Sequence, residues 1–168
     1  MMDNTLRDII KKIRKVFKED PDSTVIGKLT EGITNEEIRK NDNVITYNDT
    51  LFKEYYEFLN TSEESAFGAI VFFGYNELSK YQFYVEDIPR GFSQWVCIGK
   101  IMSDPIMLSK RNGEVYCFSG HPFEVIEKGF GNFDYFLFNY VFGEKYSEII
   151  PGTDEDGWYQ LLIRQGIV

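Results

Sequence analysis

The chain has 168 residues, of which 43% are hydrophobic and 17% aromatic, and its formal net charge is −9. This length fits one domain with a full core, and the apolar content excludes an intrinsically disordered chain. Residues 1–18 hold six basic and two acidic side chains, net +4, whereas the remaining residues hold 12 basic and 25 acidic ones, net −13. Because so acidic a body repels phosphate backbones, we expect no nucleic-acid ligand.

The hydropathy pattern predicts neither membrane insertion nor secretion. The chain has no run of about 18 or more apolar residues and no apolar block with a small-residue cleavage site at its N-terminus. We therefore expect a cytoplasmic protein that does not bind membranes. The two cysteines, Cys97 and Cys117, fall in predicted strands, and without a secretory context we expect them to be reduced core residues.

The N-terminal segment is predicted to form an amphipathic helix. Apolar residues recur at helical spacing from Leu6 to Phe17, and Lys and Arg fill the opposite face. A basic helix of this kind can lie on a membrane surface or act as a calmodulin target. The width of its apolar stripe favours docking on a sheet instead.

Two further helices are predicted before the first strand. Thr34 and Glu37 form a capping box at the start of the short stretch NEEIRK. The second helix covers residues 47–60, with Asn48 or Asp49 as its cap.

Five consecutive strands are predicted next. Residues 67–75, 81–87 and 94–101 are rich in aromatic and β-branched side chains, which favours strands. The fourth and fifth form a hairpin around Asn112-Gly113, because this dipeptide supplies both positive-φ residues of a type I′ turn.

The hairpin turn also predicts a strand register. With a two-residue loop, Arg111 faces Glu114 and Leu108 faces Cys117. One face is expected in the core, and the other is expected to be a mixed surface without a catalytic group. The core face holds Ile106, Leu108, Val115 and Cys117, and the mixed face holds Ser109, Arg111, Glu114 and Tyr116.

Two helices are predicted to close the chain. The first covers residues 132–143 and ends at Gly143, and the second covers residues 154–166, with Asp154 or Asp156 as its cap. Helices first, strands next and helices last indicate an α+β protein. We expect a single domain over residues 1–168, with an antiparallel sheet of about five strands covered by the N- and C-terminal helices.

No combination of residues predicts catalysis or metal binding. His121 is the only histidine, and no nucleophile is placed to pair with it. The cysteines lie 20 positions apart, and no paired metal-ligand motif occurs. The glycines of residues 129–133 lack the rest of a phosphate-loop or dinucleotide motif. We expect no catalytic residue, no cofactor, no metal site and no enzymatic activity.

A mixture of aromatic and acidic side chains marks a candidate partner-binding surface around the predicted strand 81–87. Tyrosine supplies contact area at interfaces, and carboxylates steer association with a basic partner. Alternate residues of a half-buried strand are also aromatic, so Tyr81 or Phe83 can belong to the core instead. The candidate residues are Tyr75, Glu77, Tyr81, Tyr84, Glu86 and Asp87.

The order of these segments resembles the SUKH superfamily between Tyr47 and Tyr146. The likeness rests on the helix LFKEYYEFLN, a strand that begins near Gly68, the stretch WVCIGKIMSDPIMLSKRNGEVYCF, and the helix FGNFDYFLFNYVFG. In that family a strand ending in Ile-Gly leads through a short loop to a hairpin. The corresponding positions here are Ile98, Gly99, Asp104, Ile106, Leu108 and Gly113.

The resemblance implies a SUKH-like binding protein, and we expect a monomer without catalytic activity. The family includes bacterial immunity proteins, which neutralise toxin domains that are often nucleases, and fungal regulators of cell-wall synthesis. The first branch implies a basic toxin domain as the partner, and the acidic body of the chain suits such a partner. The second branch implies the alternative, a regulatory scaffold or adaptor with no toxin partner.

Overall fold

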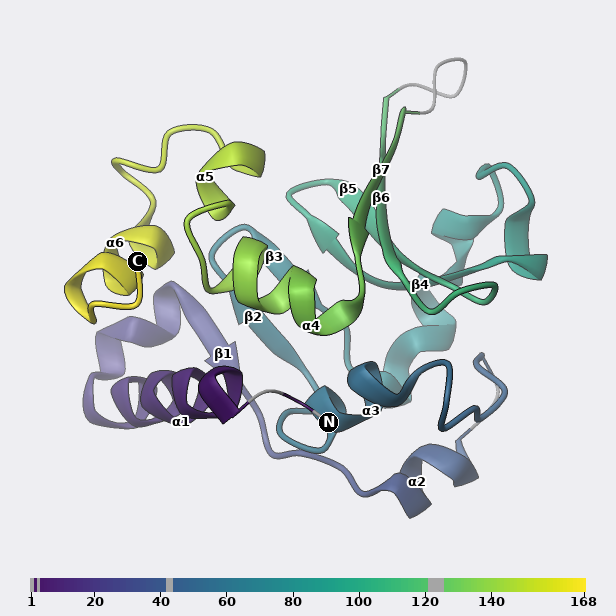
Figure 1. Ribbon diagram of the computed structural model, residues 1–168, viewed down its shortest axis with the longest axis horizontal. Coiled ribbons are helices and arrows are strands. Elements are labelled where there is room, and N and C mark those ends of the chain that lie inside the picture. The colour runs from purple at the N-terminus through teal and green to yellow at the C-terminus, as the bar shows by residue number, and fades with distance from the viewer. Residues whose placement is uncertain (1, 3, 42–43, 121–125) are drawn as a thin grey trace.

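Seven short strands form one antiparallel sheet in the computed structural model, which describes residues 2, 4–41, 44–120 and 126–168 (Figure 1). Strands adjacent in the chain are adjacent in the sheet, so the connections are simple. The predicted antiparallel α+β fold is confirmed, but the predicted number of about five strands is wrong. The strands are β1 (Gly27–Leu29), β2 (Ser65–Phe67), β3 (Ile70–Phe72), β4 (Trp95–Ile101), β5 (Asp104–Ser109), β6 (Val115–Ser119) and β7 (Ile126–Gly131).

The errors in strand number arise at three places in the chain. The predicted strand 67–75 contains the end of β2, a tight turn and the whole of β3. Gly68 in this turn has a φ of 59° that disfavours other residues. β1 has only three residues, and β7 contains two charged residues and two glycines, a composition that is unusual for a strand. Neither of these strands was predicted.

Helical segments surround the sheet. The N-terminal helix and the capping box of Thr34 and Glu37 are confirmed, and Asp156 rather than Asp154 caps the last helix. Asn48 instead caps a turn ahead of the third helix, because its Oδ1 accepts from the N–H of Thr50 and Leu51. The α-helices are α1 (Asn4–Glu19), α2 (Asn35–Lys40), α3 (Lys53–Leu59), α4 (Phe133–Phe136), α5 (Tyr146–Ile149) and α6 (Gly157–Arg164). The 3₁₀ segments are η1 (Pro21–Val25), η2 (Tyr75–Val85) and η3 (Gly91–Ser93), and the π-helical turn η4 (Leu137–Val141) extends α4.

Aromatic rings form the core between one face of the sheet and the helices. Phe72 of β3 lies 5.4 Å from Phe58 of α3 and 5.7 Å from Phe133 of α4, measured between ring centroids. Phe67 of β2 lies 5.1 Å from Trp158 of α6. In Figure 1, helix α4 crosses in front of the strands, which agrees with the contact between Phe133 and Phe72.

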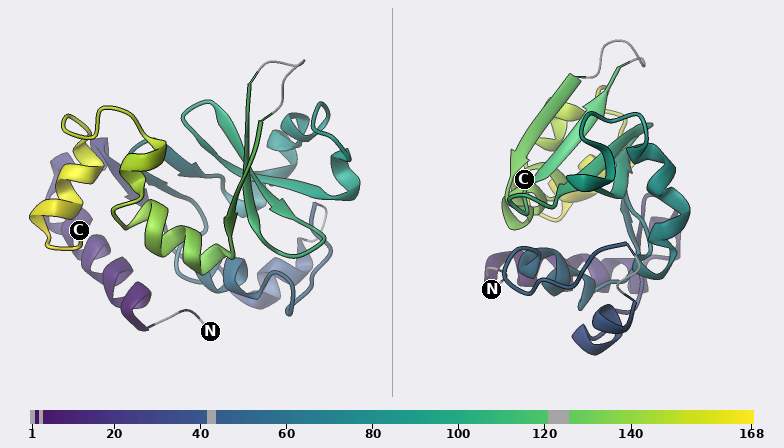
Figure 2. Two further views of the ribbon diagram at one scale, coloured as in Figure 1. Left: turned by 45° about the horizontal axis from the view of Figure 1, so that its top comes forward. Right: turned by 90° about the vertical axis from the view of Figure 1, so that its right-hand side faces the viewer.

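Helix α1 docks beside α6 at one end of the sheet (Figure 2), as its apolar stripe predicts. Leu6, Ile10 and Ile13 are buried, and Phe17 lies 6.2 Å from Trp158. In the part of the chain that the structure describes, no helix has both the length and the apolar content needed to cross a bilayer.

The predicted hairpin exists as β5 and β6, but its predicted two-residue turn is wrong. Leu108 pairs with Val115 rather than with Cys117, so the loop has four residues. The buried Ser109 closes this loop: its Oγ accepts from the N–H of Arg111 at 3.1 Å, and its carbonyl accepts from the N–H of Gly113 at 2.9 Å. A shift of two residues preserves the alternation of faces, so the predicted apolar face remains buried. Ser109 was predicted on the other, mixed face and is instead buried.

Candidate functional site

The segment predicted as the strand 81–87 is mostly 3₁₀-helical and belongs to η2, which packs against β4. Its buried residues are Tyr75, Leu78 and Val85. These residues lie three and then seven positions apart, which is typical of one face of a helix and not of the alternating positions of a strand. Read in this way, the sequence would have placed Phe83 outside the buried face, where the structure has it. The prediction of a strand relied on the content of aromatic and β-branched residues and not on their spacing.

The six predicted partner-binding residues divide between the core and the surface. Tyr75 is only 3% exposed, and its hydroxyl donates to the carbonyl of Ile38 at 3.3 Å, so it does not belong to an accessible surface. Tyr81 and Tyr84 are half-buried. The three acidic residues, Glu77, Glu86 and Asp87, are exposed.

Two exposed phenylalanines adjoin these residues in the chain and were not predicted as partner-binding residues. Phe83 is 56% exposed and stacks on Tyr84, with ring centroids 4.3 Å apart. Phe92 of η3 is 50% exposed. Large exposed aromatic side chains on an acidic segment suit an interface better than open water. The name η2–η3 surface is used below for Glu77, Tyr81, Phe83, Tyr84, Glu86, Asp87 and Phe92.

Contacts along the whole length of η2 hold this surface in place. At its start, the N–H of Asn76 donates to Glu63 Oε1 at 3.0 Å. In its middle, the ring of Tyr81 stacks on Phe73 with centroids 3.8 Å apart. Beyond its end, Trp95 Nε1 donates to the carbonyl of Pro89 at 3.0 Å. The surface is thus a fixed platform and not a loose loop, which reduces the entropy lost on binding.

The acidic residues of the η2–η3 surface differ in whether they form an ion pair within the protein. Glu77 forms an ion pair with Lys80. Among the described residues, neither Glu86 nor Asp87 has a basic group within ion-pair distance. Arg90, which follows them, is bound to Glu127 at 3.4 Å and has a φ of 74°, an uncommon conformation for arginine. Glu86 and Asp87 are therefore the carboxylates of this surface that are available to a partner.

The cysteines do not form a reactive site. Both are free and buried, as predicted, and burial raises the pKa of Cys97 and of Cys117 to about 12. A thiol with so high a pKa is protonated at neutral pH and is a poor nucleophile. His121 lies outside the described residues. Within the described ranges, no group of three or more His, Cys, Asp or Glu side chains is arranged to hold a metal ion.

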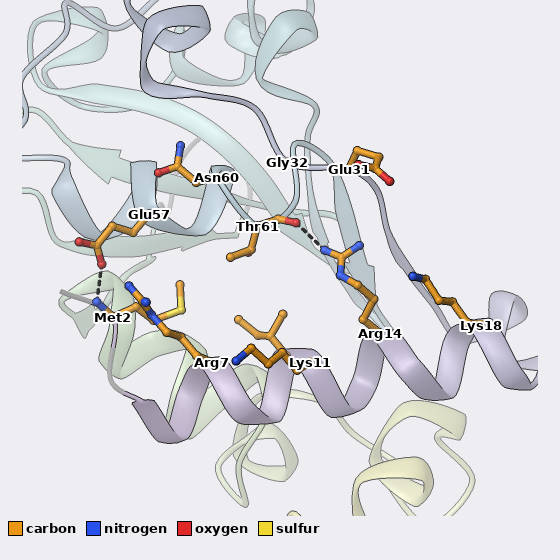
Figure 3. Close-up of a pocket in the computed structure, with 11 residues that line it drawn as sticks. Met2, Arg7, Lys11, Arg14, Lys18, Glu31, Gly32, Glu57, Asn60 and Thr61 are labelled. Carbon is orange, nitrogen blue, oxygen red and sulfur yellow. Dashed lines mark hydrogen bonds between the residues drawn. The ribbon is translucent and has the colours of Figure 1, made fainter.

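A pocket of about 570 Å³ lies between α1, the end of α3 and the segment after β1 (Figure 3). Four basic residues of α1 line one wall, and Glu31 and Glu57 line the other. The sequence indicated the basic face of this helix but not that it borders a pocket. The pocket and the η2–η3 surface have no lining residue in common.

No family model and no curated protein matches this chain.

Proposed function

We propose that the chain is a non-catalytic protein-binding module, an immunity protein of the SUKH type that neutralises a basic toxin domain. The pattern of residues between Tyr47 and Tyr146 supports this function, as do the acidic charge of the body and the absence of a catalytic motif in the sequence. The protein acts by occupying a surface of the toxin, so it requires neither a cofactor nor a chemical step.

The observation that carries the proposal is the η2–η3 surface. It combines exposed rings, Phe83 and Phe92, with the unpaired carboxylates of Glu86 and Asp87 on a rigid platform. Aromatic side chains at the centre of an interface supply most of the binding energy, while carboxylates accelerate encounter with a basic partner. A toxin that holds phosphate groups in its own substrate site presents a basic surface of the kind this platform suits.

The test uses the toxin domain encoded beside this chain, purified with its active site disabled. In the test variant, Glu77→Lys, Glu86→Lys and Asp87→Lys are combined. A matched variant combines Glu148→Lys, Asp154→Lys and Glu155→Lys, which makes the same change in charge at exposed residues elsewhere. Both variants should remain folded, because exposed substitutions usually cost less than about 0.5 kcal/mol.

The two variants should differ in their association rates. At low salt the test variant should associate with the toxin domain at least about tenfold more slowly than the matched variant. This difference in association rate should become smaller at about 1 M salt, because charges are then screened over about 3 Å. Equal rates for the two variants would place the interface elsewhere. If no toxin gene adjoins the gene for this chain, the function as a regulatory scaffold replaces the proposal.

A further inference from the structure

A row of basic side chains follows one face of α1 and lines the pocket shown in Figure 3. Successive members lie four, three and four residues apart, so they recur about once per helical turn over a rise of about 16 Å. In Figure 3 they extend from α1 toward the opposite wall of the pocket. The α1 basic row consists of Arg7, Lys11, Arg14 and Lys18.

Arg14 fixes the shape of the pocket. Its Nη1 donates to the carbonyl of Thr30 at 3.1 Å, and its Nη2 donates to the carbonyl of Thr61, which follows α3. These bonds tie α1 to both neighbouring segments. On the opposite wall, a Cβ at Gly32 would collide with the backbone oxygen of Asn60, so only glycine allows this close approach. The pocket is therefore already formed in the free protein.

In the part of the chain that the structure describes, the basic groups that line the pocket outnumber the acidic ones. Among the described residues, Arg7 and Lys18 have no ion-pair partner, and Lys11 has only Asp8 at 4.0 Å. The lining holds four basic and two acidic side chains, net +2, in a chain whose net charge is −9. One of the two carboxylates, that of Glu57, already accepts from the N–H of Met2.

We propose that this pocket binds an extended peptide segment that has acidic residues at alternate positions. In an extended chain, alternate side chains lie on one side about 6.6 Å apart. The members of the α1 basic row lie about 4.5–6 Å apart along the helix axis, and flexible Lys and Arg side chains can span the difference. Consecutive acidic residues would place only half of their carboxylates on the side of α1.

This inference concerns a different surface and does not rest on the proposed function. The probe is a fluorescein-labelled peptide of seven residues in which four Glu alternate with Ser. A second peptide has the same composition with its four Glu consecutive. Fluorescence anisotropy should give a dissociation constant for the alternating peptide that is about fivefold lower than for the second.

Matched protein variants separate the pocket from the general charge of α1. Because an exposed ion pair contributes only modestly to binding, Arg7→Gln combined with Lys18→Gln should weaken binding of the alternating peptide about fivefold to tenfold. Lys12→Gln combined with Lys15→Gln removes the same charge from exposed residues that do not line the pocket, and it should change affinity less than twofold. Arg14 is left intact because it holds the walls together.

Several results would overturn the proposal. Equal affinity for the two peptides, or equal losses in the two double variants, would show attraction by charge without recognition of spacing. If neither peptide binds at millimolar concentration, the pocket is not a binding site for acidic peptides. Tighter binding of inorganic tripolyphosphate than of the alternating peptide would assign the pocket to a small anion.

Discussion

The side-chain amide of Gln82 forms two hydrogen bonds with the backbone of Cys97. Gln82 Oε1 accepts from the N–H of Cys97 at 3.0 Å, and Gln82 Nε2 donates to its carbonyl at 2.9 Å. The pairing of β3 with β4 ends at Gly99, so β3 offers Cys97 no ladder partner. Gln82 takes the place of a neighbouring strand at that point and joins η2, with its candidate binding surface, to the sheet.

Replacing Gln82 should therefore loosen the platform. Gln82→Ala removes the partners of one buried N–H and one buried carbonyl, and it should lower the free energy of unfolding by about 1–3 kcal/mol. Ser79→Ala changes an exposed residue of the same segment and should cost less than about 0.5 kcal/mol. Urea unfolding of the two variants checks the difference. If the Gln82→Ala and Ser79→Ala variants are equally stable, water replaces the hydrogen bonds of the Gln82 amide without loss of stability.

The cysteines should be unreactive in the folded protein. Burial raises the pKa of both thiols from 9.0 to about 12. A disulfide reagent such as dithionitrobenzoate should label neither Cys97 nor Cys117 at pH 8, and should label both after denaturation in guanidinium chloride. Labelling of either thiol in the native protein at the rate of a free thiol would contradict their burial.

The same shifts predict how stability depends on alkaline pH. The raised pKa means that the folded state holds its thiol protons more tightly, so this contribution is complete below pH 9 and is lost as pH rises from about 9 to about 12. Each thiol should contribute a slope of at most about 1.4 kcal/mol per pH unit. A variant with Cys97→Ala and Cys117→Ala should lose stability less steeply in this range. Parallel curves would show that the thiols do not contribute.

Tyr146 should be more important for stability than its neighbour Tyr159. Its hydroxyl accepts from the N–H of Ala69 at 3.1 Å and donates to Asp156 Oδ2 at 3.0 Å, which links the turn between β2 and β3 to the cap of α6. Tyr146→Phe should therefore lower the free energy of unfolding by about 1.5–3 kcal/mol. The hydroxyl of Tyr159 has no hydrogen bond among the described residues, so Tyr159→Phe is the matched control. Thermal and urea unfolding should separate the two variants, and equal midpoints would contradict the linking role.

The sequence predicted elements whose signals are local. The capping box of Thr34 and Glu37 and the apolar stripe of α1 depend on residues a few positions apart, and both occur in the structure. The hairpin was also predicted, but its predicted register was wrong by two residues. The Oγ of Ser109 accepts hydrogen bonds from the N–H groups of Arg111 and Asn112, which stabilises a four-residue loop. This loop forms in place of the two-residue turn that Asn112-Gly113 predicts.

Features that depend on distant partners could not be predicted in this way. β1 is a strand because it pairs with β2, which lies almost 40 positions further along the chain. The pocket beside α1 depends on Arg14, which bonds to carbonyls that follow two other elements. Of the six predicted partner-binding residues, the three acidic ones were correctly expected to be exposed, whereas Tyr75 is buried and bonds to Ile38 of α2.

The aromatic residues of the η2–η3 surface should have separable roles. Tyr81 is half-buried on Phe73, so Tyr81→Ala should lower the free energy of unfolding by about 1–3 kcal/mol through lost burial and lost ring stacking. Phe83 and Phe92 are largely exposed, so Phe83→Ser and Phe92→Ser should change stability by less than about 0.5 kcal/mol.

If the rings of Phe83 and Phe92 form the centre of the interface, each serine variant should accelerate dissociation of the toxin domain about tenfold or more, with little effect on association. The two contributions are thereby tested separately. Reversing the charge of Glu86 and Asp87 should change the association rate, whereas removing the rings should change the dissociation rate. Unchanged dissociation rates in both serine variants would mean that the exposed rings do not contact the partner, whatever the acidic residues do.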